Sequence, residues 1–308
     1  MRQVYINFMT DIKTAKDRII LVPMDFSDSS VNAVYYAVEM ANLFDSEIML
    51  LHVLSNSRMS TLFSNDSQIA LLRDSVRTKL EEYKDKIITK WPNIKVSTKV
   101  EEGKPYKVIN RVANEGHCDT IVIGFNGLNG VEQFTGSTTT RIIKSSPIPV
   151  VIVKEKRVAP KFDKIVLPID LTKTSKQKID WAVKLGKQYD STVHVIMELE
   201  KDELIKKKAK ANLLQAESIF KEHGVKFVSQ LLDDMEYPDH LGMDAIKYAE
   251  EIDADLIMIM TKSETSRISD LFVGSFAEQV VKSSQKTPVM CINPKPTGSK
   301  ATGGSGFY

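Results

Sequence analysis

Short apolar runs alternate with longer amphipathic segments along the chain, a pattern typical of parallel strands covered by helices. Residues 18–25 are apolar and rich in β-branched side chains, as expected of a buried strand. Residues 69–88 place apolar side chains at helical spacing. Because such segments alternate, we predict a doubly wound α/β fold with parallel strands. In the first half, the expected strands are 18–25, 48–54, 94–100, 120–123 and 148–153, and the expected helices are 31–42, 69–88, 106–115 and a segment after Gly136.

The second half of the chain repeats landmarks of the first half in the same order, which predicts an internal duplication. The matched landmarks are Pro23 and Asp25 with Pro168 and Asp170, Asp45 with Asp190, 118–122 with 254–258, and Gly136 with Gly274. We therefore predict two domains, at 17–154 and 162–293, joined by a short linker. The Gly/Ser-rich tail at 294–308 is expected to be disordered.

A glycine-rich stretch separates the last two predicted strands of the first half. Gly124 ends one apolar run, Gly127 follows three residues later, and Gly136 with Ser137 precedes a helix-like segment. Glycines let the backbone approach an anion, and a helix N-terminus supplies free N–H groups. The spacing matches neither the dinucleotide fingerprint nor the Walker loop, since no Lys follows Gly136. From the residues alone, a phosphate cradle and a glycine-rich turn without a ligand stay equally open.

Composition and charge exclude several classes of function. Hydrophobic residues make up 42% of the chain and the net charge is only +2, so we expect globular cores and no nucleic acid as the main partner. No apolar run reaches the roughly 18 residues that a membrane span needs, and the N-terminus has no signal-peptide core. The two cysteines, Cys118 and Cys291, are far apart, and we expect buried thiols in a cytoplasmic protein.

Few other residues suggest chemistry. The five histidines show no metal-ligand spacing, and no serine lies in a nucleophile-elbow motif, so we predict neither a metal site nor a catalytic residue. His52 lies in an apolar strand and is expected to be packed and hydrogen-bonded. Asp25 ends a strand at the edge where open α/β sheets bind ligands, although a turn or helix-cap carboxylate is the alternative.

The landmarks together resemble the universal stress protein family, in two tandem copies that cover 17–154 and 162–293. The resemblance is carried in the first half by residues 23–27, by Leu51-His52-Val53, by Gly103 and Pro105, and by the glycine stretch. It implies, for each half, a five-stranded parallel sheet with helices on both faces, similar to adenine nucleotide alpha hydrolases. It also implies a role as a stress-response or signalling module.

ATP-binding members of this family carry Gly, two residues, Gly, nine residues, then Gly-Ser or Gly-Thr. The resemblance therefore implies a site for ATP, or for ADP or AMP, with Mg2+ as a possible accompanying ion. Its phosphate and ribose end would be formed by Gly124, Gly127, Gly136, Ser137 and Thr138, and its adenosine end by Pro23, Asp25 and Val53. In this chain eight residues, not nine, separate Gly127 from Gly136.

The second half departs further from the family's pattern. At the positions that we match to Gly124–Gly127 it has Thr261–Glu264, followed after nine residues by Gly274. Both loop glycines are absent, and an anionic Glu264 near phosphate is unfavourable. We therefore expect nucleotide binding in the first half only, with turnover very slow or absent because no general base is evident beyond Asp25. A scaffold that acts through protein contacts and binds no nucleotide is the alternative.

The last predicted strand of each half suggests how the chain assembles. Residues 148–153 and 288–292 are apolar, and single-domain members of the family pair their last strands about a two-fold axis. A linker of about eight residues, reaching roughly 28 Å when extended, makes the same pairing intramolecular. We therefore predict an intramolecular pseudo-dimer with Val151 and Cys291 near the seam, and higher oligomers remain open.

Overall fold

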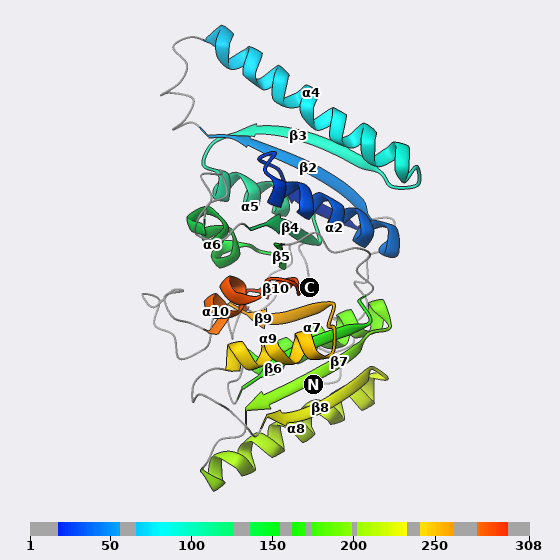
Figure 1. The fold of residues 1–308 in the computed structure, drawn as a ribbon, viewed down its shortest axis with the longest axis vertical. Coiled ribbons are helices and arrows are strands. Elements are labelled where there is room, and N and C mark those ends of the chain that lie inside the picture. Colours follow the sequence, from blue (N-terminus) through cyan, green and yellow to red (C-terminus); the bar gives the residue numbers. More distant parts are fainter. Residues whose placement is uncertain are drawn as a thin grey trace. The chain divides into compact units, whose positions relative to one another are not determined.

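The computed structural model describes residues 18–55, 66–125, 136–154, 162–170, 174–198, 202–232, 241–261 and 276–294. These residues belong to two units, one ending at Lys154 and the other beginning at Phe162 (Figure 1). Each unit contains five parallel strands with helices on both faces, which confirms the predicted fold class. None of the helices among the described residues is both long enough and apolar enough to cross a membrane.

The first unit has the strand order β3-β2-β1-β4-β5. Its elements are β1 (Ile19–Pro23), α2 (Asp28–Phe44), β2 (Glu47–Leu54), α4 (Asp66–Lys90), β3 (Val96–Glu102), α5 (Pro105–Glu115), β4 (Thr120–Gly124), α6 (Gly136–Ser145) and β5 (Val150–Val153). Successive strands step outward from β1 first in one direction and then in the other. Because parallel crossovers are right-handed, α2 and α4 cover one face of the sheet, and α5 and α6 cover the opposite face.

The second unit repeats this order as β8-β7-β6-β9-β10. Its elements are β6 (Lys164–Ile169), α7 (Thr174–Tyr189), β7 (Thr192–Glu198), α8 (Glu203–His223), β8 (Lys226–Leu232), α9 (Leu241–Glu251), β9 (Leu256–Met260), α10 (Phe276–Ser283) and β10 (Val289–Ile292). Shared hydrogen bonds also reveal the duplication. The Asp119 carboxylate accepts from the backbone N–H of Ile19 at 3.0 Å, and Asp255 accepts from that of Lys164 at 3.1 Å.

Local sequence explains where α2 begins and ends. The Ser27 hydroxyl accepts a hydrogen bond from the backbone N–H of Ser30 at 3.2 Å, so Ser27 is the N-cap and the helix begins at Asp28, three residues earlier than predicted. The helix ends at Phe44, and its C-cap residue, Asp45, adopts a left-handed conformation with φ of 49°. Its repeat counterpart Asp190 does the same, with φ of 53°. Asp tolerates this conformation better than most residues, which accounts for its presence at both positions.

The central strands are apolar on both faces, as parallel strands between two helical layers must be. All five residues of β4 are buried, and so are all five of β9. Both cysteines are buried free thiols, as expected from their apolar surroundings, and burial raises the pKa of the Cys291 thiol well above its ordinary value.

Candidate functional site

The strands of the first unit separate at the carboxyl edge of the sheet. Strand β1 pairs with β2 as far as Pro23, but its pairing with β4 is confined to Ile20 and Leu21. Proline has no backbone N–H, so Pro23 cannot extend the ladder toward β4. This is also where the strand order reverses, the position at which open α/β sheets bind ligands. Pro23, Asp25 and Gly124 thus lie at this same edge of the sheet, and we call this place the crevice.

Asp25 orders the turn that leads from β1 into α2. Its Oδ1 accepts hydrogen bonds from the backbone N–H of Ser27 at 3.1 Å and from the Ser27 hydroxyl at 2.6 Å. Ser27 in turn caps α2, so the carboxylate stabilises the turn and the helix N-terminus together. The turn role that we held open for Asp25 is therefore present. The carboxyl group is half-buried and remains at the edge of the crevice.

Gly124 is required by close packing between β4 and α2. A Cβ atom at this position would lie 2.1 Å from the carbonyl oxygen of Ser29 and 2.2 Å from its carbonyl carbon. No side chain can be accommodated at such distances from backbone atoms unless the helix moves. We had interpreted Gly124 only through phosphate, and the packing requirement could not be anticipated because it joins segments almost a hundred residues apart.

The glycine stretch itself is only partly described. Gly127 and Gly130 lie outside the described residues, as do Gly274 and the loop of the second unit that precedes it. Gly136 and Ser137 begin α6, and Thr138 in the same turn is half-buried. Because α6 follows the carboxyl end of β4, its N-terminus lies at the same edge of the sheet as the crevice.

An aromatic cluster lies on the face of the first unit's sheet that is covered by α4. Buried His52 donates from Nδ1 to the carbonyl oxygen of Met24 at 2.7 Å, which confirms the packed, hydrogen-bonded histidine expected in this strand. Its ring stacks on Phe26 at a centroid distance of 5.0 Å, and Phe26 also stacks on Tyr83 at 6.2 Å. The ammonium of Lys79 lies 4.5 Å from the Phe26 centroid. Burial lowers the pKa of His52, so the ring is neutral at physiological pH.

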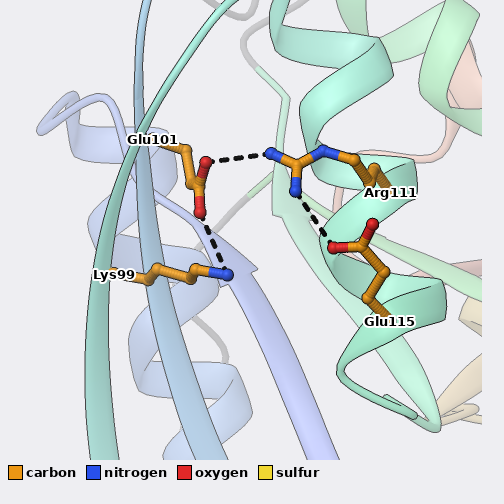
Figure 2. A network of polar contacts seen from close by, with 4 residues as sticks. All are labelled: Lys99, Glu101, Arg111 and Glu115. Atoms are coloured by element: carbon orange, nitrogen blue, oxygen red, sulfur yellow. Dashed lines mark hydrogen bonds and ion pairs between the residues drawn. The ribbon is translucent and has the colours of Figure 1, made fainter.

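Val53 lies on the opposite face, beside a network of charged side chains. It pairs with Glu101 across β2 and β3, so both point toward α5. The Glu101 carboxylate accepts from the Lys99 ammonium at 3.0 Å and from Arg111 of α5 at 2.9 Å, and Arg111 also bonds Glu115 at 3.0 Å (Figure 2). The hydrogen bond from Lys99, followed by that from Arg111, lowers the pKa of Glu101. The network ties the edge strand β3 to α5 beside buried Val53.

Strand pairing corrects our match between the two glycine positions and the second unit. Gly124 pairs with Val153, and Met260 pairs with Ile292 in the equivalent strands. The counterpart of Gly124 is therefore Met260 and not Thr261, so the match to Thr261–Glu264 is wrong by one residue where it begins. Loop lengths differ between the repeats, and only the hydrogen-bonded register of the strands defines equivalence. Neither glycine is retained in either alignment.

The second unit places a lysine in its own crevice. Lys178 stands where the first unit has Ala33, 145 residues earlier, and is only 5% exposed. Its Nζ donates to the carbonyl oxygen of Pro168 at 3.2 Å and lies 3.6 Å from Oδ2 of Asp170. Burial lowers the pKa of Lys178, and the Asp170 charge opposes this shift. We missed this residue, although aligning the repeats from Asp25 and Asp170 onward would have revealed the exchange of Ala33 for Lys.

Strand register reveals another exchange at this edge. Pro23 pairs with Leu51 and Pro168 pairs with Ile196, so Glu198 stands where the first unit has Val53. A half-buried carboxylate thus replaces an apolar side chain at the adenosine end that we inferred. In the described parts of both units, no group of three or more His, Cys, Asp or Glu side chains could hold a metal ion.

Fold and crevice together define a class: a doubly wound α/β protein in two tandem copies, with a candidate ligand site at the strand-order reversal of the first copy. The sequence model described as the Universal stress protein family matches residues 17–154 and 161–293, and the chain belongs to this family.

Individual relatives agree with this membership. The chain is 32% identical over 142 residues to Universal stress protein MJ0531 of Methanocaldococcus jannaschii, a match that covers 45% of this chain and 82% of that protein. It is 31% identical over 153 residues to Universal stress protein MJ0577 of the same organism, covering 44% of this chain and 94% of that protein. A crystal structure of a universal stress protein from Archaeoglobus fulgidus has a TM-score of 0.70 at 19% identity, covering 91% of this chain and 97% of that one, and it supports the fold.

Proposed function

We propose that this protein is a nucleotide-binding stress-response module that binds ATP, or a related adenine nucleotide, in its first unit with little or no turnover. One observation carries the proposal: the two units have the same fold but different residues at the crevice. The first unit has Ala33, Val53 and Gly124 where the second has Lys178, Glu198 and Met260. Small and apolar residues in one copy are replaced by charged or larger ones in the other.

The residues of the first unit suit the parts of an adenine nucleotide. Val53 is apolar and buried near the carboxyl end of β2, at the adenosine end that the family resemblance implies. The Asp25 carboxylate would accept hydrogen bonds from an amino or hydroxyl group. Phosphate would bind at the N-terminus of α6, where backbone N–H groups and the helix dipole favour an anion. Mg2+, if it accompanies the nucleotide, would be held mainly by phosphate oxygens and water.

Stoichiometry tests the proposal directly. Nucleotide released by heating the purified protein should be identified by mass spectrometry as an adenine nucleotide, and calorimetry should find one site per chain. Gly127→Glu should abolish binding through steric block and charge repulsion. The control Gly274→Glu, at the position of the second unit that matches Gly136, should leave binding nearly unchanged. Two equivalent sites, or no site, would contradict the proposal.

The shortened glycine loop favours a second candidate, a scaffold that binds no nucleotide. With eight residues instead of nine between Gly127 and Gly136, the N–H groups of α6 could be misplaced for phosphate. The same calorimetry separates the two functions. A steady-state ATPase rate above about 1 s⁻¹, the lower range for enzymes, would exclude both and indicate an enzyme.

A further inference from the structure

Lys154 lies directly beyond the last strand of the first unit, at the same edge of the sheet as the crevice. Its carbonyl oxygen accepts a hydrogen bond from Nδ2 of Asn32 on α2 at 3.1 Å, so the backbone is held in place where β5 ends. Its ammonium lies 5.4 Å from the ring centroid of Phe125, the residue that follows Gly124 and is only 4% exposed. The Lys154 side chain therefore packs against a buried aromatic ring.

The alternation of side chains assigns Lys154 to one face of the sheet. Gly124 and Val153 are paired, and a Cβ on Gly124 would point at α2. The backbone N–H of Phe125 donates to the carbonyl oxygen of Val153 at 3.0 Å, so the ladder continues past Gly124, and alternation places Phe125 and Lys154 on the opposite face. That face is covered by α5 and α6, and the N-terminus of α6 lies at this same edge. The Lys154 side chain and the N-terminus of α6 thus lie at the same edge and on the same face of the sheet.

The second unit lacks this cation. Strand register places Asn293 where the first unit has Lys154, and Thr261 where it has Phe125. The Thr261 hydroxyl donates to Oδ1 of Asn293, so these two neutral side chains are bonded to each other. A lysine is therefore present in the copy that has the loop glycines and is replaced by a neutral amide in the copy that lost them.

We propose that the Lys154 ammonium binds the outer phosphates of the nucleotide and makes the first unit selective for nucleoside di- and triphosphates. The inference rests on the proposed function, since it assigns a further residue to that same site. A half-buried ammonium forms a stronger charge-assisted hydrogen bond to phosphate than a fully hydrated one. Burial lowers the pKa of the Lys154 amine to about 8, so it is mainly protonated at pH 7.

The test compares ligands that differ only in phosphate. Calorimetry of the full-length chain at pH 7 would measure ATP, AMP, adenosine and inorganic tripolyphosphate. We expect Lys154→Gln to weaken ATP and tripolyphosphate by about tenfold or more, the value of a charge-assisted hydrogen bond, and to change adenosine by less than about twofold. Lys154→Arg should retain ATP affinity. The matched control is Lys90→Gln, an exposed lysine at the end of α4, at the opposite edge of the sheet.

Three other outcomes would overturn the inference, and the measured affinities distinguish them from one another. If wild type binds ATP and Lys154→Gln binds it equally well, the inference fails while the proposed function stands. If Lys154→Gln weakens adenosine as much as ATP, its effect is structural and no phosphate contact exists. If wild type binds neither ATP nor tripolyphosphate, the inference and the proposed function fail together. Melting curves of the variants would identify loss of fold as a separate cause.

Discussion

At the scale of single residues, Gly124 is required by the close packing of β4 against α2. A methyl group here would lie 2.1 Å from the Ser29 carbonyl oxygen, far inside the 3.4–4 Å of ordinary contact, so α2 would have to move away from β4. We expect Gly124→Ala to lower the free energy of unfolding by about 3 kcal/mol, the upper range for overpacking, as measured by urea denaturation.

Gly224 provides the control for this substitution. A Cβ at Gly224 would meet nothing within 4 Å, but the residue has φ of 67°. Gly224→Ala should therefore cost only about 1 kcal/mol, through backbone strain without a clash. Equal losses for the two variants would show that packing against Ser29 is not what requires glycine at position 124.

We expect His52 to make the first unit sensitive to acid. Its pKa is lowered by burial below the value of 6.5 that holds in the unfolded chain, so the unfolded state takes up the proton first. The contribution of neutral His52 to stability is therefore complete above pH 6.5 and is lost as the pH falls toward its folded pKa. We expect the melting temperature of wild type to drop between pH 7 and pH 5.

A histidine replacement isolates this effect from that of other titrating groups. Asparagine at position 52 can still donate to the Met24 carbonyl but does not titrate. His52→Asn should be less stable than wild type at pH 7, because the stacking on Phe26 is lost, and should lose less stability than wild type between pH 7 and pH 5. Parallel pH profiles for the two proteins would refute a role of His52 in the acid response.

At the scale of elements, the edge strand β3 is held to α5 by charged side chains that are partly exposed. The Glu101 carboxylate accepts hydrogen bonds from both Lys99 and Arg111 (Figure 2). The Glu101 side chain is 23% exposed. We expect Glu101→Gln to lower stability by less than about 1 kcal/mol, because exposed ion pairs contribute little. Amide hydrogen exchange in β3 should nevertheless become faster, since the anchor to α5 is weakened.

The effect of salt on amide exchange distinguishes an electrostatic contribution of this network from simple side-chain packing. At about 1 M NaCl the Debye length is roughly 3 Å, so the difference in exchange between wild type and Glu101→Gln should shrink. A difference that is unchanged by salt would assign the effect to lost side-chain packing. Because Val53 is the cross-strand neighbour of Glu101, the same comparison also reports on how firmly the strands are held at Val53.

At the scale of the whole molecule, the pairing of residues 148–153 with 288–292 stays a prediction from the sequence. Strands β5 and β10 are each apolar and each pair with β4 or β9 of their own unit. An apolar edge strand tends to pair with another chain when its partner is removed. We expect residues 1–157 alone to form a homodimer by light scattering, and Val151→Lys to weaken it. A folded, monomeric fragment would contradict the prediction.

Sequence alone determined the class of fold, the duplication and the family. These properties follow from local signals, namely apolar runs of strand length, helical periodicity and recurring turn residues such as Asp45 and Asp190, which carry the same information in any context. The boundaries of β1, β2 and α5 were predicted to within a few residues for this reason. The expectation that His52 would be packed and hydrogen-bonded came from its apolar neighbours in the same strand.

Only the tertiary structure decided which residues meet at the carboxyl edge of each sheet. That Gly124 touches Ser29, that Met260 is its true counterpart, and that Lys178 reaches Pro168 all depend on strand register and on helix-to-sheet distance. These quantities are set by hydrogen bonds and packing between segments remote in sequence, which no local pattern records. The two copies therefore share a fold that their periodicity predicts, while their crevices differ through contacts that only the folded chain makes.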